Sequence, residues 1–198
     1  MAIHAAAGAD DQDIVHEILE GEVDAFALLM TRHQDYVLAI VKRHVPADQA
    51  EELAQEVFIK AFQSLAGWRR QGRFRSWLSA IAVRTCYDFW RKHYRSREVP
   101  LSALSEAHRE WLDRALADAS ESSWQKISRR REAREILDWV LDQLSAADRM
   151  VLELVYLEER SAKEAARLLG WTVANVKVRA FRAKRKITKL LLQDGRAK

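Results

Sequence analysis

Apolar residues recur three and four positions apart along most of the chain, which is the spacing of one buried face of an α-helix. The repeat is clearest in residues 48–65, where its members are Leu53, Ala54, Val57, Phe58, Ala61, Phe62 and Leu65. A similar repeat covers residues 23–45, and Pro46 separates the two segments. The 198 residues include only two prolines and six glycines, so long helices are permitted and a loop-rich β fold is not expected. The pattern predicts an all-α protein.

A third helix is predicted to begin at Phe74, with apolar positions at Phe74, Trp77, Leu78, Ile81 and Ala82. After Arg97 the periodicity weakens, in a stretch that combines Pro100, several serines and mixed charge. A connection of this length predicts two helical domains joined by a flexible linker. Trp111 and Trp124 lie in this linker. Two interpretations stay open for them, namely local packing or an anchor for a regulatory partner.

The second half of the chain carries repeated signals for helix starts and stops. A helical set begins near Lys126, and Ser145 opens the capping-box-like stretch "SAAD". Ser161 opens a second capping-box-like stretch, "SAKE", at the start of a short helix that Gly170 ends. Thr172 caps the next helix, which runs to about residue 192. The stretch "SAKEAARLLGWTVANVKVRAFRAKRKI" is therefore a short capped helix, a tight glycine turn and a longer basic helix. This is the sequence signature of a helix-turn-helix.

The basic helix has two different sides. One side is apolar and is expected to pack on its own domain, through Val176, Ala180, Ala183, Ile187 and Leu190. The other side mixes cations with apolar groups, which suits the major groove of duplex DNA, because arginine pairs with guanine and apolar groups touch thymine methyls. The predicted duplex-binding residues are Asn175, Lys177, Val178, Arg179, Phe181, Arg182 and Arg185. The alternative is a solvated basic face of a bundle helix.

Charge is segregated along the chain, although the net charge is only +4. Residues 10–62 contain twelve acids and four Lys/Arg, residues 69–97 contain nine Lys/Arg and one acid, and residues 172–193 contain seven Lys/Arg and no acid. The single cysteine, Cys86, cannot form an internal disulfide and fits a cytoplasmic location. No run of apolar residues is long enough to insert directly into a membrane. The start, "MAIHAAAGADDQD", is interpreted as a frayed leader rather than a secretory signal.

The third helix interleaves aromatic and basic residues, in "RFRSWLSAIAVRTCYDFWRKHYR". Rings supply stacking platforms for unpaired bases and arginines follow phosphates, so this composition suits melted, single-stranded DNA. The predicted contact residues are Arg73, Arg75, Trp77, Arg84, Tyr87, Asp88, Trp90, Arg91 and Tyr94. One chain would then carry a duplex reader and a strand-capturing surface, which is the pair of activities that transcription initiation requires.

Three stretches in this order closely resemble bacterial RNA polymerase sigma factors of the extracytoplasmic-function group in the sigma-70 family. They are "ADQAEELAQEVFIKAF", "FRSWLSAIAVRTCYDFWRK" and "LSAADRMVLELVYLEERSAKEAARLLGWTVANVKVRAFRAKRKI". The resemblance implies a region 2 domain at 12–97 for the promoter −10 element, a linker at 98–125, and a region 4 domain at 126–194 for the −35 element. It also implies three partners: core RNA polymerase, through the clamp helices of its largest subunit and the flap of the second, promoter DNA, and an anti-sigma factor.

The resemblance assigns the polymerase contact to Asp48, Glu51, Glu52, Gln55, Glu56 and Phe58. An acidic face beside an apolar stripe suits a basic protein partner, although an ordinary solvated helix face is the alternative. The chain departs from the family at Arg84, where members commonly have a base-capturing asparagine, and at Val178, which is often serine. Arginine lacks the paired donor and acceptor of an amide, so the resemblance leaves the −10 base preference open.

Two other classes of function fit the sequence less well. A stand-alone helix-turn-helix regulator with a helical sensor domain would not need the aromatic strand-binding surface. An enzyme is disfavoured, because the six histidines have no metal-ligand spacing and no glycine-rich phosphate loop is present. The sequence therefore predicts no catalytic residue, no cofactor and no metal site.

Overall fold

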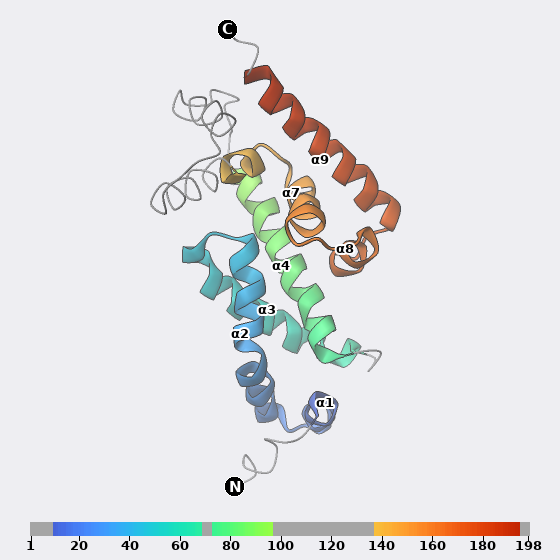
Figure 1. Cartoon of the computed structure of the whole chain (residues 1–198). Coiled ribbons are helices and arrows are strands. Elements are labelled where there is room, and N and C mark those ends of the chain that lie inside the picture. Colours follow the sequence, from blue (N-terminus) through green and yellow to red (C-terminus); the bar gives the residue numbers. More distant parts are fainter. Residues whose placement is uncertain (1–9, 69–72, 97–136, 195–198) are drawn as a thin grey trace, which may run out of the picture. The chain divides into compact units, whose positions relative to one another are not determined.

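The computed structural model describes residues 10–68, 73–96 and 137–194, and every regular element in these ranges is helical. The α-helices are α1 (Asp11–Glu20), α2 (Phe26–His44), α3 (Ala50–Ser64), α4 (Phe74–Ser96), α7 (Ala146–Leu152), α8 (Ala162–Leu169) and α9 (Val173–Asp194) (Figure 1). Residues 137–142 are also helical. The all-α prediction is confirmed. The predicted linker at 98–125, with Trp111 and Trp124, lies outside the described residues.

Short helical turns flank several of the α-helices. Turns of 3₁₀-helix occupy Val23–Ala25, Ala47–Gln49 and Leu65–Gly67, and a π-helical turn, Glu153–Leu157, follows α7. The predicted helix at 23–45 therefore becomes a 3₁₀ turn followed by α2, and Pro46 lies in extended backbone between α2 and α3. One expectation is wrong: the end of the supposed frayed leader is ordered, because Asp10 accepts a hydrogen bond from the Asp11 amide and caps α1.

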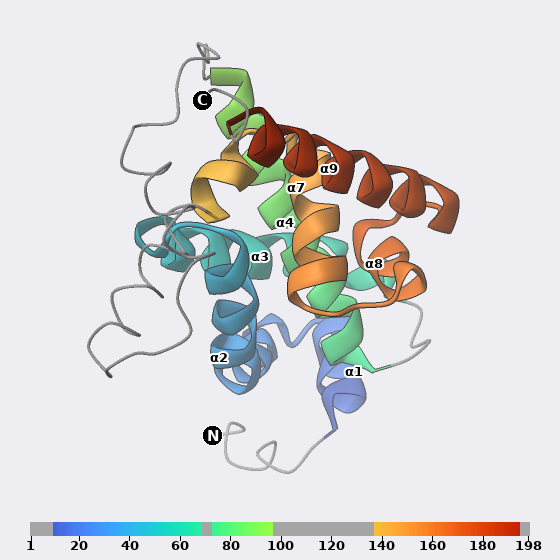
Figure 2. The ribbon, with the colours of Figure 1, turned by 45° about the horizontal axis from the view of Figure 1, so that its top comes forward.

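The described residues divide into two compact units. Unit 1 combines the described residues up to Trp90 with Arg160–Val176, and unit 2 combines those in 91–159 with those from Lys177 onward. Because the units follow contacts rather than chain order, the domain boundaries expected from the sequence stay a prediction. In unit 1, α1 packs against α2, and α2 lies beside α3 (Figure 2). The fully buried side chains of this unit include Ile14, Leu29, Val37, Val41, Val57, Leu65 and Leu78.

A carboxylate at the start of α1 fixes that helix to α2. The two oxygens of Asp11 lie 2.7 Å from Arg32 Nη1 and 2.9 Å from His33 Nε2. The His33 side chain is buried, and its ring lies against Phe74 with centroids 5.4 Å apart. The acidic first turn of α1 is thus part of the packing of unit 1 and is not only a solvated surface.

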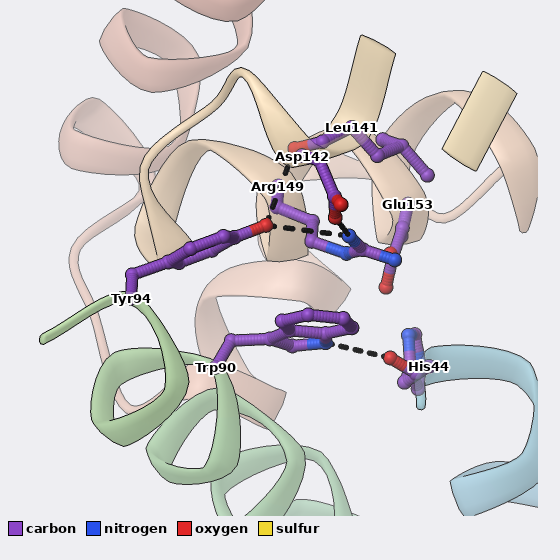
Figure 3. Close-up of polar contacts among 7 residues, drawn as sticks. All are labelled: His44, Trp90, Tyr94, Leu141, Asp142, Arg149 and Glu153. Atoms are coloured by element: carbon purple, nitrogen blue, oxygen red, sulfur yellow. Dashed lines mark hydrogen bonds and ion pairs between the residues drawn. The ribbon is translucent and has the colours of Figure 1, made fainter. Parts of the chain in front are cut away.

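Unit 2 has an apolar cluster and a buried ionic network. The cluster joins Leu141, Leu144, Leu152 and Ala183, with Leu137 and Ile187 packed against it. In the network the Arg149 guanidinium, which is 6% exposed, donates to Glu153 Oε1 at 2.8 Å and to Asp142 Oδ1 at 2.9 Å (Figure 3). Each buried charge therefore faces an opposite charge, as burial requires.

Tyr94, at the end of α4, completes this network. Its hydroxyl accepts a hydrogen bond from Arg149 Nη1 at 3.3 Å and donates to the Leu141 carbonyl at 3.4 Å. Burial raises the pKa of the Tyr94 phenol above its ordinary value, although Arg149 acts in the opposite direction. The hydroxyl therefore keeps its proton at neutral pH and remains a donor.

We expect Arg149→Met to lower the free energy of unfolding by about 3–5 kcal/mol, because it leaves Glu153 buried without its opposite charge. Urea-induced unfolding measures this loss. The double variant Arg149→Met/Glu153→Leu should recover most of it, since it removes both charges together. Arg182→Met, at an exposed position, is the matched control and should change stability by less than about 0.5 kcal/mol. A loss in the control as large as that in Arg149→Met would contradict the assignment.

Candidate nucleic-acid interfaces

Hydrogen bonds cap both ends of α8 and the start of α9 in the helix-turn-helix. The Ser161 hydroxyl accepts from the Glu164 amide at 3.2 Å, and the Glu164 carboxylate accepts from the Ser161 amide at 3.0 Å, so the predicted capping box is confirmed. Hydrogen bonds from the Ser161 side chain and backbone lower the pKa of the Glu164 carboxyl. Gly170 ends α8 with φ +73°, which glycine tolerates, and Thr172 Oγ1 accepts from the Asn175 amide to start α9.

One side of α9 carries the predicted duplex-binding residues and is open to solvent. Phe181 is 65% exposed and Val178 is 47% exposed, although both are large and apolar. On the opposite side Val176, Ala180 and Ala183 are buried, as the spacing predicted. The exposed side forms an open groove lined by Lys177, Val178, Phe181, Arg182, Arg185, Lys186 and Lys189. An exposed phenylalanine ringed by cations suits the edge of a duplex, where apolar groups meet thymine methyls and cations meet phosphates and guanine.

Two cations at the flank of α9 also contact other residues of unit 2. Arg179 Nη1 lies 3.0 Å from Asp148 Oδ1, in a half-buried ion pair that joins α9 to α7. Lys186 donates to the Gln143 carbonyl. Arg179 was predicted to contact DNA, but the structure gives it a role in fixing the position of α9. Sequence spacing could not reveal this, because Asp148 is 31 residues away.

On α4, the predicted strand-binding residues at the start of the helix are exposed or lie in an aromatic cluster. Arg73 and Arg75 are exposed, and the Arg75 guanidinium lies 3.8 Å from the centre of the Tyr36 ring. Trp77 is half-buried against Phe74 and Trp68, with ring centroids 5.3 and 6.3 Å away. Cations beside partly exposed rings are the combination that stacks bases and follows phosphates.

Tyr36 is a member of this surface that the sequence analysis missed. Its hydroxyl lies 2.6 Å from Ser79 Oγ, which joins α2 to α4, and its ring lies under Arg75. Cation–π contact of this kind orients the guanidinium. Its spacing in the sequence indicates only an apolar position of α2. Nothing in the neighbouring sequence indicates that it lies beside α4.

Trp90 was predicted to stack on a melted base, and the structure contradicts this. Its side chain is only 3% exposed, and Nε1 donates to the His44 carbonyl at 2.7 Å (Figure 3). The indole therefore joins α4 to the end of α2 inside unit 1. The sequence does contain the signal, since Leu78, Ala82, Cys86 and Trp90 repeat every four residues and all are buried.

The remaining predicted residues of α4 contact other elements of their own units. Arg84 and Tyr87 lie against α8 and the turn that follows it. Asp88 Oδ2 lies 3.7 Å from Lys60 Nζ on α3, and Tyr94 belongs to the network around Arg149. Arg91 is exposed. The predicted set is therefore not one uniformly open surface. The four arginines are exposed, Trp77, Tyr87, Asp88 and Tyr94 are half-buried, and Trp90 is buried.

The acidic surface predicted on α3 is largely present. Asp48, Glu51, Glu52 and Gln55 are exposed, and Glu56 is half-buried in an ion pair with Lys60, with Oε1 2.8 Å from Nζ. Phe58 was also assigned to this surface, but it is 6% exposed and belongs to the core. Ile59, which the analysis missed, is 56% exposed and lies one turn after Gln55 on the same side of the helix. Ile59 is thus the exposed large apolar side chain on this side of α3, where Phe58 was expected.

Within residues 10–68, 73–96 and 137–194, no three His, Cys, Asp or Glu side chains gather as ligands for a metal ion. Among the helices of the same ranges, none combines the length and the apolar character needed to cross a membrane.

Two family models match the chain in the order that the sequence analysis expects. Sigma-70 region 2 matches residues 29–96 and Sigma-70 region 4 matches residues 134–187. The chain is 30% identical over 177 residues to the ECF RNA polymerase sigma-E factor of Escherichia coli, covering 89% of this chain and 92% of that protein. It is 32% identical over 186 residues to the RNA polymerase sigma-H factor of Pseudomonas aeruginosa, covering 91% and 93%.

A solved structure is similar across nearly the whole chain. It is CnrH in complex with the cytosolic domain of CnrY, and it matches with a TM-score of 0.51 and 25% sequence identity. The match covers 93% of this chain and 98% of that chain. The likeness in sequence and fold therefore extends over both halves of the chain.

We expect Arg185→Ala to weaken binding to any duplex and to reduce the slope of log K against log salt by about one, because one phosphate contact is lost. Fluorescence anisotropy with a labelled duplex at several salt concentrations measures both quantities. Lys42→Ala, at an exposed position on α2, is the control and should leave the slope unchanged. An unaltered slope for Arg185→Ala would remove this residue from the interface.

Proposed function

Since the chain belongs to the extracytoplasmic-function group of the bacterial sigma-70 family, we propose that it acts as a promoter-specificity subunit of RNA polymerase. It binds core polymerase and directs transcription initiation at chosen promoters. The observation that carries this function is the match to both sigma regions and to relatives along about nine-tenths of the chain. It performs no catalysis of its own, and its place of action is the cytoplasm, where the polymerase works.

The exposed side of α9 recognises the −35 duplex in this proposal. Phe181 and Val178 supply apolar contacts to base edges, and Arg182 lies one residue further along the same open groove. Lys177 and Arg185 extend the cationic surface for phosphates. Arg179 contributes indirectly, because its ion pair with Asp148 holds α9 in place.

The start of α4 holds the melted −10 strand. Arg73 and Arg75 are exposed cations, and Trp77 is a partly accessible ring beside them. Tyr36 supports Arg75 from α2. This arrangement meets the two requirements of a single-strand surface, namely positive charge for the backbone and a ring for the bases.

The exposed side of α3 docks on core polymerase. Glu51 and Glu52 lie in the first turn of α3, where negative charge is favoured by the helix dipole, and Gln55 and Ile59 continue the surface along the helix. The carboxylates repel DNA phosphates and complement a basic protein partner, such as the clamp helices of the polymerase. The cationic DNA surfaces and the anionic protein surface are thus kept on different helices.

An anti-sigma factor is the proposed regulatory partner. The supporting observation is the similarity to CnrH, whose structure was solved with the cytosolic domain of CnrY bound. A stand-alone helix-turn-helix regulator is the alternative, and it would bind an operator tightly without polymerase. Run-off transcription with purified core polymerase and a promoter library separates the two. Transcripts that start only when this chain is added support the proposal, and operator binding without any effect on initiation contradicts it.

The assignment of duplex binding to α9 and polymerase docking to α3 can be tested with two matched variants. We expect Arg182→Ala to reduce transcription from a −35-dependent promoter about tenfold, because a guanidinium contact to a base is worth about 1–3 kcal/mol. Its affinity for core polymerase should not change. Glu52→Ala should do the reverse, weakening polymerase binding while leaving duplex binding by the free chain intact. Run-off transcription and core-binding titrations measure the two effects. If either variant lost DNA recognition and polymerase affinity to the same extent, the assignment of these roles to α9 and α3 would be refuted.

A further inference from the structure

Tyr36 on α2 and Arg75 on α4 form a closed ring of contacts through Ser79. The central carbon of the Arg75 guanidinium lies 3.8 Å from the centre of the Tyr36 ring. The Tyr36 hydroxyl lies 2.6 Å from Ser79 Oγ, and Ser79 Oγ donates to the Arg75 carbonyl at 2.7 Å. The guanidinium and the backbone of the same arginine are therefore both connected to one tyrosine on the neighbouring helix.

The direction of these hydrogen bonds follows from the single hydrogen of a serine hydroxyl. Ser79 uses this hydrogen on the Arg75 carbonyl, so the Tyr36 hydroxyl is the donor toward Ser79. Ser79 is only 8% exposed, so water competes little for the two hydrogen bonds. They anchor the phenol end of Tyr36 and thereby restrict the orientation of its ring.

The guanidinium lies on the ring with one of its two faces. At 3.8 Å the central carbon is itself in van der Waals contact with the ring. An edge-on guanidinium would place a nitrogen between this carbon and the ring, and would hold the carbon further away. Arg75 is an exposed residue, so the face that points away from Tyr36 is open to solvent.

A flat cation held in this way is a stacking platform. Guanidinium planes stack on aromatic rings, and unpaired bases stack on arginine as well as on aromatic side chains. Arg75 also loses less conformational freedom on binding, because Tyr36 already holds its side chain. A phosphate contact needs only a positive charge, which a flexible lysine supplies equally well. The fixed, flat geometry therefore suits a base more than a phosphate.

We propose that Arg75 is a base-stacking residue, whose guanidinium binds one unpaired base of the −10 strand on the face opposite Tyr36. Tyr36 and Ser79 are its positioning residues. The inference rests on the proposed function of α4 in strand capture, and it changes the role of one cation within that function from following the DNA backbone to binding a base.

The complex of the chain with core polymerase distinguishes base stacking from a phosphate contact. We expect Arg75→Lys to weaken binding of a single-stranded −10 oligonucleotide about tenfold, nearly as much as Arg75→Ala, because one stacked base is worth roughly five- to 150-fold in affinity. Fluorescence anisotropy measures the affinities. Arg73→Lys, at an exposed position just before α4, is the matched control and should stay within about twofold of the wild type, since it keeps its charge. Wild-type affinity in Arg75→Lys would overturn the proposal, as would a wild-type complex that does not bind this oligonucleotide.

Oligonucleotides that lack one base locate the partner of Arg75. At a single position, removal of the base should weaken binding of the wild-type complex about tenfold, and Arg75→Lys should cause no further loss there. Removal of a base elsewhere should leave the effect of Arg75→Lys in place. If the effect of Arg75→Lys is the same at every position, the residue contacts the backbone and the proposal is wrong.

Substitutions at Tyr36 separate the positioning of Arg75 from simple packing. Tyr36→Leu removes the ring and should weaken strand binding about as much as Arg75→Lys, whereas Tyr36→Phe loses only the hydrogen bond to Ser79 and should lose less. Tyr36→3,4,5-trifluorophenylalanine keeps the shape of phenylalanine but withdraws electron density from the ring face, so it should bind the strand less tightly than Tyr36→Phe. Equal affinities of the last two variants would mean that the ring only packs, which contradicts the positioning role.

The stack can also be observed in the free chain without DNA. The ring current of Tyr36 shifts the NMR signal of the Arg75 Nε–H group, and Tyr36→Leu should abolish this shift. An Arg75 signal that does not respond to Tyr36→Leu would refute the stack. If the stack and its dependence on one base are observed but the chain and core polymerase together start no transcript, the proposed function fails and the stack stands. If transcripts start and Arg75→Lys binds the strand as the wild type does, the inference fails and the proposed function stands.

Discussion

Helix α4 must bury an apolar face and present many cations at the same time. The packing of the helices around it depends on how both requirements are met. The helix has to bury an apolar stripe that continues through Leu78, Ala82, Cys86 and Trp90, and it also carries a dense set of cations. The hydrogen bond from Trp90 to the His44 carbonyl fixes one side of α4 on α2, which leaves the other side for Arg73 and Arg75. A helix that presents charge so close to its core face needs this firm attachment, because burying an unpaired guanidinium is very unfavourable.

Electrostatics separates the proposed partners of the chain. The acids of α3 and the cations of α4 and α9 lie on different helices, so each surface attracts one kind of molecule and repels the other. Where opposite charges do meet inside a unit, they form specific contacts: Asp11 with α2, Arg179 with Asp148, and Arg149 with Glu153. These contacts fix helix positions, and the exposed charges remain available for binding.

The contacts of Arg84 give a physical reason for this chain's departure from its family. Arg84 stands where the family resemblance leads us to expect an asparagine, and its guanidinium donates to the last carbonyls of α8.

The sequence by itself determined the helices, their caps and the basic face of α9. These features depend on neighbours within a few residues: the three-and-four spacing, the Ser161–Glu164 capping box, the glycine after α8 and the clustering of cations. It did not reveal that α1 is ordered from Asp11, because that order comes from Arg32 and His33 on another helix.

The tertiary structure alone decided which side chains of each helix remain accessible. Trp90 and Phe58 were assigned to surfaces and are buried, Arg179 is half-buried against Asp148, and Arg84 is exposed but donates a hydrogen bond to α8. Periodicity states that residues share a face, but another helix must be in place before that face is covered. The partners of these four residues lie distant in the chain or on other helices, and packing between helices is what brings such positions together.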